Sequence, residues 1–355
     1  MHRVDRRKSE QTKTGRRPSA DDTARGDDPP RLHLEPVSHA AGERDDFAAA
    51  VRAGLTAAAK SIPCRFLYDA RGSLLFERIT ELPEYYPTRA ERSILRAHAA
   101  DIARCVKPPV ELVELGSGSA SKTRALIETL IEANGSLVFR PIDISPTILE
   151  ASSRELLDAH PTLVIEGLVG EYDAALRSLA ERHEGRSRLV LWLGSSIGNL
   201  SREAAARFLA RVRGALGRAD RLLVGVDLRK DARVLERAYD DADGVTAAFD
   251  LNLLARINRE LGGHFDLARF RHEASYDVEA GRVEMHLVSL GAQRVPIDRL
   301  GIEVGLADGE AIHTESSYKY SLAEIDALAS AAGLAVEQRW LDRDGLFSSN
   351  LLRPA

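Results

Sequence analysis

The stretch LVELGSGSASKTR, residues 112–124, decides the fold class. An apolar run reaches the acidic Glu114, two glycines follow in the spacing Gly-x-Gly, and residues with helical periodicity come next. Four more short apolar runs continue this rhythm, separated by helical stretches. Such alternation predicts a parallel, doubly wound α/β sheet that is covered by helices on both faces. The expected strands span residues 110–115, 137–143, 163–170, 189–194 and 221–228.

The glycine turn is the first candidate for ligand binding. A dinucleotide fingerprint requires a third glycine where this chain has Ser121, and an acid about 20 positions on, whereas Asp143 lies 27 residues past Gly116. A phosphate loop does not fit either, because Lys122 does not follow a glycine. What remains is a close-approach turn preceded by Glu114, which would repel phosphate but receive a cation. S-adenosylmethionine fits, because it carries an ammonium, a sulfonium and a ribose diol but no phosphate.

The ends of the second and third expected strands carry polar side chains. Since ligands of open α/β sheets bind beyond the carboxyl ends of the strands, these side chains should approach the glycine turn. Asp143 is placed to accept hydrogen bonds from a ribose diol, and Glu171 with Tyr172 is placed to meet an adenine amino group and ring. A solvated loop is the alternative for each of them taken singly.

An aromatic group falls at the chain breaks near Pro83 and Pro87. It consists of Tyr68, Phe76, Tyr85 and Tyr86. Core packing is the default for such rings. Two tyrosines between two prolines nevertheless predict a loop, in which the hydroxyls are available to a ligand.

The chain has a distinct N-terminal segment and a distinct insertion. Residues 1–35 are polar and rich in glycine and proline, which predicts a disordered tail. The first twenty residues hold seven basic side chains against two acidic ones, so contact with nucleic acid and plain solvation are both open. After residue 228 a long helical stretch leads to strand-like runs at 281–290 and 312–321, which predict an insertion with its own sheet. The final residues predict a helix and two strands that return to the first sheet.

Composition narrows the class of protein. The 355 residues are 44% hydrophobic and carry a net charge of −5, which supplies a globular core and no general attraction for nucleic acid. No apolar run approaches the roughly 20 residues that cross a bilayer, and no signal peptide is evident, so we expect a cytoplasmic protein without a membrane partner. Cys64 and Cys105 are far apart and predict neither a disulfide nor a metal site.

Longer strings carry a family resemblance. The ordered strings include ELGSGSASKT, PIDIS, VGEYD, LWLGSSIGNL, GVDLRKD, LNLLARINRELG, RVEMHL and TESSYKY. In this order they resemble the histidine-specific Nα-methyltransferases of ergothioneine biosynthesis, from about residue 40 to the end. The resemblance implies three successive methyl transfers from S-adenosylmethionine to L-histidine, through its mono- and dimethyl forms, to the betaine hercynine.

The same resemblance implies a domain arrangement. A class I methyltransferase domain with a Rossmann-like doubly wound sheet would comprise residues 91–228 and 322–355. An inserted α+β substrate-binding domain would be assembled from residues 36–90 and 229–321. We expect a monomer with small-molecule partners and no nucleic acid.

The resemblance also implies site residues. Those carried over to the S-adenosylmethionine site are Gly116, Gly118, Lys122, Asp143, Glu171 and Tyr172. Those carried over to the histidine site are Tyr68, Tyr85, Asn199, Tyr239, Met285, Glu315 and Ser317, of which Tyr85 and Asn199 would position the reacting amine. No metal is implied. One departure is Glu171, where the family usually has aspartate, so the adenine contact there is displaced.

The chemistry of imidazole agrees with the assignment of Glu315 and Ser317. A carboxylate and a hydroxyl together satisfy both ring nitrogens. An edge strand with alternate side chains in water is the other interpretation of TESSYKY. Two rival functions also remain, a methyltransferase of this fold acting on another amine, and a non-catalytic S-adenosylmethionine- or RNA-binding module that uses the basic tail.

Overall fold

The computed structural model describes residues 31–37, 43–181 and 185–355. The predicted tail therefore lies outside the described residues as far as residue 30. No helix within the described ranges combines the length and the apolar character that crossing a membrane requires.

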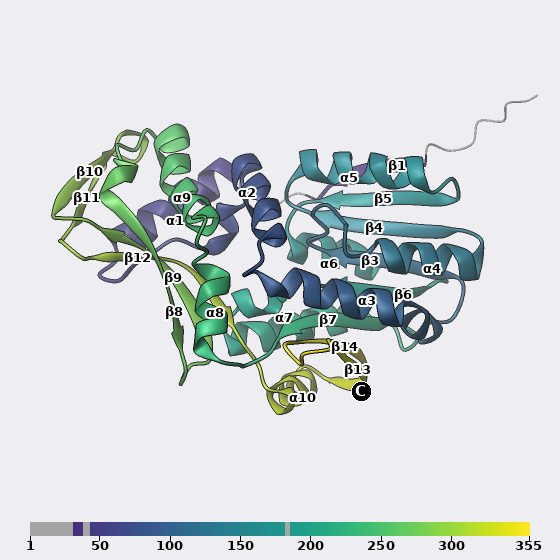
Figure 1. The fold of residues 1–355 in the computed structure, drawn as a ribbon. Helices are drawn as coiled ribbons and strands as arrows, with labels where there is room; N and C mark the ends of the chain where they lie inside the picture. Colours follow the sequence, from purple (N-terminus) through teal and green to yellow (C-terminus); the bar gives the residue numbers. More distant parts are fainter. Residues whose placement is uncertain (1–30, 38–42, 182–184) are drawn as a thin grey trace, which may run out of the picture. The chain divides into compact units, whose positions relative to one another are not determined.

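An eight-stranded sheet forms the larger layer of the fold (Figure 1), in the order β1-β5-β4-β3-β6-β7-β14-β13. The first six strands of this order are parallel, and β14 and β13 close the sheet in antiparallel fashion. Strands β3 and β4 have the predicted bounds, and β5, β6 and β7 end within two residues of theirs. The strands are β1 (Leu32–Pro36), β3 (Val110–Leu115), β4 (Leu137–Asp143), β5 (Leu163–Val169), β6 (Ser187–Trp192), β7 (Arg221–Asp227), β13 (Leu334–Leu341) and β14 (Phe347–Pro354).

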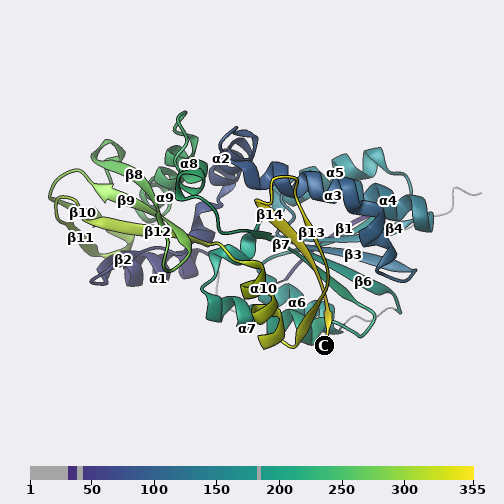
Figure 2. The same ribbon diagram turned by 60° about the horizontal axis from the view of Figure 1, so that its bottom comes forward.

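Helices cover both faces of this sheet, as Figures 1 and 2 show. One apolar core packs α3 (Tyr86–Arg104), α4 (Arg124–Asn134) and α5 (Pro146–Ala159) against one face. A second core packs α6 (Tyr172–Glu181), α7 (Arg202–Ala215) and α10 (Leu322–Ala331) against the other. The parallel strands are buried on both sides, which explains their almost unbroken apolar sequences. The doubly wound class I methyltransferase fold is thus confirmed.

Strand β1 corrects the predicted tail, which was extended to residue 35. Leu32–Pro36 instead pairs in parallel with β5 at the edge of the sheet. The Arg31 side chain donates hydrogen bonds to the carbonyls of Leu157 and His160 at the end of α5. The prolines around this segment suggested disorder, but an edge strand tolerates proline because one side of it needs no ladder hydrogen bonds.

A second region has its own sheet and its own core. Its strands are β2 (Lys60–Ser61), β8 (Phe270–Asp277), β9 (Arg282–Ser289) and β12 (Ala311–Tyr318), with the hairpin β10 (Gln293–Ile297) and β11 (Ile302–Leu306). Its helices are α1 (Glu43–Thr56), α2 (Ala70–Glu81), α8 (Ala232–Tyr239) and α9 (Val245–Leu261). Short 3₁₀ turns span Cys64–Leu67, Ser196–Asn199, Leu267–Arg269 and Asp298–Leu300.

The predicted domain limits relate to these elements in two ways. The limits at 228/229 and 321/322 fall in connections, after β7 and before α10. The limit at 90/91 falls inside α3, whose buried face packs on the large sheet. Helix α3 therefore contributes to both cores, through Tyr86 at its start and through Ile94 and Leu95 further along.

The strand order reverses between β3 and β6. From β3 the chain proceeds to β4 and β5 on one side, and from β6 to β7 on the other. Ligands of open α/β sheets bind at such a switch point, beyond the carboxyl ends of the strands. The predicted glycine turn follows β3 at this point.

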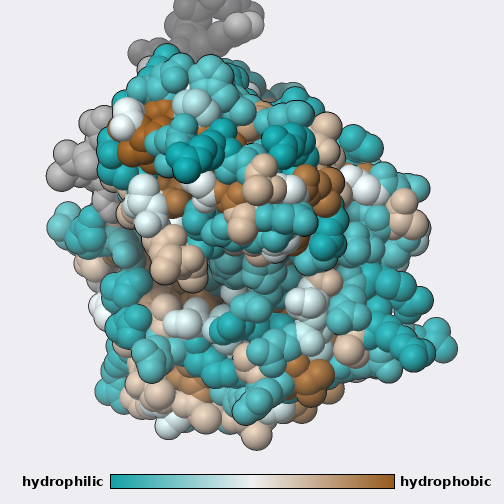
Figure 3. Space-filling view, turned by 90° about the vertical axis from the view of Figure 1, so that its left-hand side faces the viewer, coloured by the Kyte–Doolittle hydropathy of each residue, from teal (hydrophilic) through white to brown (hydrophobic). Residues whose placement is uncertain are grey.

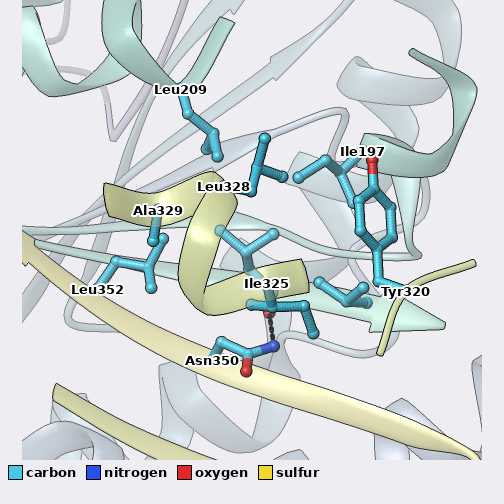
Figure 4. A pocket seen from close by; sticks show the side chains of 10 residues that line it. Ile197, Leu209, Tyr320, Ile325, Leu328, Ala329, Asn350 and Leu352 are labelled. Atoms are coloured by element: carbon cyan, nitrogen blue, oxygen red, sulfur yellow. Dashed lines mark hydrogen bonds between the residues drawn. The ribbon is translucent and has the colours of Figure 1, made fainter. Parts of the chain in front are cut away.

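Two other features do not indicate ligand sites. A gap of about 10 Å³ is lined by apolar side chains such as Leu209, Ile325 and Leu328, and by Asn350. Figure 4 shows these side chains around α10. That volume holds about one water molecule, so the gap is core packing. Figure 3 shows that the face carrying the β10–β11 hairpin is largely hydrophilic, with apolar side chains in small separate patches.

Candidate active site at the sheet edge and strand β12

The glycine turn after β3 approaches a tyrosine closely. Gly116 has φ +71°, and a Cβ atom placed there would lie 2.3 Å from the Tyr172 hydroxyl oxygen. The backbone N–H groups of Gly116 and Ser117 both donate to the carbonyl of Ile142, at 2.8 and 3.1 Å. A side chain at Gly116 would close this space, so the position requires glycine for its conformation and for the approach.

Asp143 ends β4 and holds the second glycine of the turn. Its carboxylate accepts hydrogen bonds from Gly118 N and Ser145 N, each at 2.9 Å. Burial raises the pKa of Asp143 above its usual range, and these backbone donors oppose that rise. Each carboxylate oxygen keeps a second lone pair, so a diol can still be bound here.

Glu114 lies directly before the turn and is buried. One of its oxygens accepts a hydrogen bond from the Thr123 hydroxyl at 2.7 Å, and Oε2 has no hydrogen-bond partner. Burial raises its pKa to about 8. A buried carboxylate with one unsatisfied oxygen is a ready acceptor for a cationic or N–H group of a ligand.

Lys122 and Glu171 lie on the same edge with different partners. The Lys122 ammonium forms an ion pair with buried Glu91 at 2.8 Å, and Glu91 also accepts from Gly194 N, at 2.8 Å, at the end of β6. The Glu171 side chain is 37% exposed, with Arg65 Nε 4.0 Å from its carboxylate. Glu91 was not among the predicted residues, because a single acid on an apolar helix face gives no sequence signal.

Strand β12 presents Glu315 and Ser317 on one face. Both side chains are buried, whereas Ser316 between them is half-buried, as the two-residue period of a strand requires. Glu315 lies opposite Met285 of β9. Glu315 Oε2 has no hydrogen-bond partner, and burial raises the pKa of this carboxyl to about 7. The alternative of a solvent-facing polar edge is excluded.

Four aromatic rings lie near the Glu315 carboxylate and contact one another in a row. Tyr68 packs edge-on against Phe76 with centroids 5.4 Å apart, Phe76 meets Tyr85 at 6.2 Å, and Tyr85 meets Tyr239 at 6.1 Å. Burial and then the Glu315 charge raise the pKa of Tyr68 above its usual range. The rings of Tyr68, Phe76, Tyr85 and Tyr239 therefore form a continuous aromatic cluster near Glu315.

The predicted loop holds for Tyr85, which lies in the connection between α2 and α3, but it is wrong for Tyr86. Tyr85 is the N-cap of α3 and Tyr86 is its first residue, and both are buried. Pro87 is favourable in the first turn of a helix, so it is compatible with the start of α3 instead of excluding it. The Tyr86 hydroxyl is engaged, since it donates to Asp227 at 2.8 Å.

The turn that contains Asn199 approaches β12 from the large sheet. It ends the 3₁₀ turn after β6, and the preceding Gly198 packs on β12. A Cβ atom at Gly198 would lie 2.8 Å from the Tyr318 carbonyl oxygen and 3.3 Å from Ser317 Oγ. This close approach joins the glycine-turn side of the site to Ser317.

Two further residues of the cluster escaped the sequence interpretation. Lys319 is fully buried and its ammonium contacts Ser317, Tyr239 and Asp227. Asp227 ends β7 and is also fully buried. A signal was present, because Lys319 follows Glu315 and Ser317 at the same two-residue spacing.

A cleft of about 490 Å³ adjoins these residues. Its lining includes Tyr68 and Asp69 from the second region, Ile144 and Ser145 after β4, and Arg259 of α9. Ile144 is next to Asp143, so the cleft reaches the carboxyl end of β4. Within the described part of the chain, no group of three or more His, Cys, Asp or Glu side chains is arranged to hold a metal ion.

The fold and this sheet edge define an S-adenosylmethionine-dependent methyltransferase. More narrowly, residues 47–354 match the family of histidine-specific, S-adenosylmethionine-dependent methyltransferases, and the chain belongs to that family.

Named relatives agree with this assignment. The chain is 44% identical to the histidine N-alpha-methyltransferase of Mycolicibacterium smegmatis, over 85% of this chain and 92% of the relative. It is 41% identical to the enzyme of the same name from Mycobacterium tuberculosis, over 90% and 97%. It is also 34% identical to ergothioneine biosynthesis protein 1 of Neurospora crassa, over 79% of this chain but 32% of that protein.

Proposed function

We propose that this enzyme transfers three methyl groups from S-adenosylmethionine to the α-amine of L-histidine and releases hercynine, the first step of ergothioneine biosynthesis. One observation carries the proposal: a buried carboxyl group and a buried hydroxyl group lie on one face of β12. Glu315 has an unsatisfied oxygen, and Ser317 lies two residues further along.

Imidazole satisfies this pair better than other side chains. Its N–H donates to Glu315, and its second nitrogen bonds the Ser317 hydroxyl. A charge-assisted hydrogen bond contributes about 1.5–3 kcal/mol, which is about 10- to 150-fold in binding. Phenylalanine or leucine would leave the Glu315 carboxylate buried without a partner, so such side chains are rejected more strongly.

The cofactor site is proposed at the glycine turn. Gly116 and Gly118 provide the close approach, Asp143 and Glu171 provide acceptors, and Tyr172 lies over Gly116. Glu114 adds an unsatisfied acceptor, and Lys122 a cation, at the same edge. Bound S-adenosylmethionine supplies an electrophilic methyl group.

Tyr85 and Asn199 are proposed to position the α-amine, with Tyr239 beside them. The α-amine must lose a proton before each methyl transfer, so the site has to align the neutral amine with the methyl group and give its proton a route away. Burial, Tyr239 and other neighbours keep the pKa of Tyr85 well above its usual range. Its hydroxyl therefore stays protonated and can orient the amine or pass on a proton without holding negative charge.

The test is a substrate panel. Purified full-length protein is incubated with S-adenosylmethionine and each standard amino acid, and with mono- and dimethylhistidine, and added methyl groups are followed by mass spectrometry. We expect the enzyme to convert histidine, monomethylhistidine and dimethylhistidine to the trimethyl product, and to methylate no other amino acid of the panel. Methylation of a different amino acid would keep the fold and cofactor but refute the substrate assignment.

A variant tests the amine assignment separately. Asn199→Ala should lower turnover of histidine while S-adenosylmethionine binding persists. Full turnover by this variant would refute the role of Asn199. The monomeric state, the cytoplasmic location and the absence of nucleic-acid binding stay predictions.

A further inference from the structure

Lys319 holds two of the hydroxyls of the proposed histidine site, those of Ser317 and Tyr239. Its ammonium donates to Tyr239 Oη at 2.7 Å and to Ser317 Oγ at 2.8 Å, and pairs with Asp227 Oδ2 at 2.9 Å. The lysine and the aspartate are both fully buried. Three ammonium protons thus meet three acceptors, which fixes the position of the ammonium.

The two hydroxyls are also bonded to each other. Tyr239 Oη and Ser317 Oγ lie 2.8 Å apart. Each oxygen accepts one proton from Lys319, so neither of these bonds uses a hydroxyl proton. One hydroxyl proton lies between the two oxygens, and the other is left for a ligand. The lysine therefore converts two freely rotating hydroxyls into a unit that offers a single donor.

We propose that Lys319 is a positioning residue for substrate selection, which holds Ser317 and Tyr239 so that one hydroxyl proton is directed at the bare nitrogen of a neutral imidazole. The inference rests on the proposed function, because it takes histidine as the substrate. In combination with Glu315 as acceptor of the imidazole N–H, it makes the site complementary to a ring with one donor and one acceptor.

A purely structural role for Lys319 is the alternative. The lysine would then serve only to balance the buried Asp227 charge. Lys230 offers a matched control for this, because it also pairs with Asp227 and contacts the Tyr86 hydroxyl at 2.6 Å. The hydrogen bonds and the ion pair of the Lys230 ammonium are to the Tyr86 hydroxyl and Asp227, so it shares only the charge-balancing role of Lys319.

The experiment compares Lys319→Met with Lys230→Met in the full-length enzyme. Steady-state kinetics are measured with L-histidine and with 2-thienylalanine, a five-membered ring of similar size that lacks both nitrogens. We expect K319M to raise KM for histidine about 10- to 100-fold with kcat and the KM for S-adenosylmethionine within about threefold. K230M should leave the histidine KM within about threefold, and only K319M should reduce the preference for histidine over thienylalanine.

A double-mutant cycle identifies the route of the effect. If Lys319 acts through Ser317, K319M/S317A should be no more than about twofold worse than S317A. Additive losses, or equal effects of K319M and K230M on the histidine KM, would overturn the inference. If K319M does not fold, K319M/D227N removes both charges and is compared with D227N.

Two failures remain distinguishable. A wild-type enzyme that does not methylate histidine refutes the proposed function, and this inference with it. A wild-type enzyme that does so while K319M and K230M behave alike refutes the role of Lys319 alone.

Discussion

Glu111 and Glu114 lie three residues apart on β3 and are both buried, yet their surroundings differ. Glu111 forms ion pairs with Arg140 and Arg188, each at 2.7 Å. Burial alone would raise its pKa, but the two guanidinium groups more than offset this and its pKa lies below the usual range. Glu114 has one hydroxyl partner and one unsatisfied oxygen, and burial raises its pKa to about 8.

The difference follows the direction of the strand. Glu111 is near the start of β3, far from the edge where ligands bind. Each of its oxygens forms an ion pair with an arginine side chain. Glu114 is at the carboxyl end of β3, and one of its oxygens has no hydrogen-bond partner. The same is true of Glu315 on β12. A buried acid whose oxygens are all paired serves the fold, whereas a buried acid with an oxygen that the protein leaves unpaired marks a candidate place for a ligand.

Of the changes considered, removal of the Glu111 ion pairs should give the largest effect on stability. Glu111→Gln removes the charge that pairs with buried Arg188 and leaves Arg140 with the partly exposed Glu166 as its carboxylate, so we expect a loss of about 3–5 kcal/mol in the free energy of unfolding. The kcat/KM of the folded enzyme should be unchanged. Urea denaturation measures the first and methyl transfer the second. Glu166→Gln is the matched control, because Glu166 also contacts Arg140 at 2.7 Å but its side chain is 36% exposed. A loss below 1 kcal/mol for E111Q would contradict the comparison.

Glu315→Gln should show the reverse pattern. Removal of the charge that receives the imidazole N–H should lower kcat/KM for histidine about 10- to 150-fold, while stability is unchanged or higher because no buried charge is left unpaired. Methyl transfer followed by mass spectrometry and thermal unfolding check the two effects. Ser316→Ala on the opposite face of β12 is the control, since Ser316 bonds His313 at 2.9 Å, and it should keep full activity. A stable E315Q enzyme with normal activity would refute the assigned role.

Part of this molecule could be predicted from sequence because the signal is local. Strands β3 and β4 had the predicted bounds, since continuous apolar runs between turn residues have few other interpretations. Strand β1 was missed because it contains only two leucines among prolines, and its partner β5 lies some 130 residues away. Tyr86 was placed in a loop because a proline in the first helical turn resembles a break.

The site shows the same limit. The family resemblance supplied Glu315 and Ser317, and the strand period placed both on one face. Lys319 continues that period but was not included, because a lysine next to tyrosines in sequence is usually solvated. Its burial depends on Asp227, which is 92 residues away in the chain and meets it only after folding.

The pH dependence of stability should also differ between the paired acid Glu111 and the acid Glu315, which has an oxygen without a partner. The pKa of Glu315 is raised to about 7, chiefly by burial and further by Asp250, while Lys319 and His272 lower it. The folded state therefore retains a proton that the unfolded chain releases, and stability falls as pH rises from the unfolded pKa through 7. Between pH 6 and pH 8 the wild-type enzyme should lose about 1 kcal/mol more than E315Q. Urea denaturation at both pH values measures this, and parallel curves would contradict it. Glu111 has the opposite sign, since its stabilisation is lost as pH falls.

The smallest effect is expected at Glu171, the exposed member of these acids. Its side chain is 37% exposed at the end of β5, so any contact with adenine competes with water. Glu171→Asp restores the residue usual in the family and moves the carboxylate by one methylene. We expect the KM for S-adenosylmethionine to change less than about fivefold, with the histidine KM and the stability unchanged. The same substitution at Glu114 should raise the KM for S-adenosylmethionine more, because a shortened buried acid can neither keep its Thr123 bond nor reach a ligand. Equal responses at the two positions would show that burial does not separate them, and that the unpaired oxygen of Glu114 is not a cofactor acceptor.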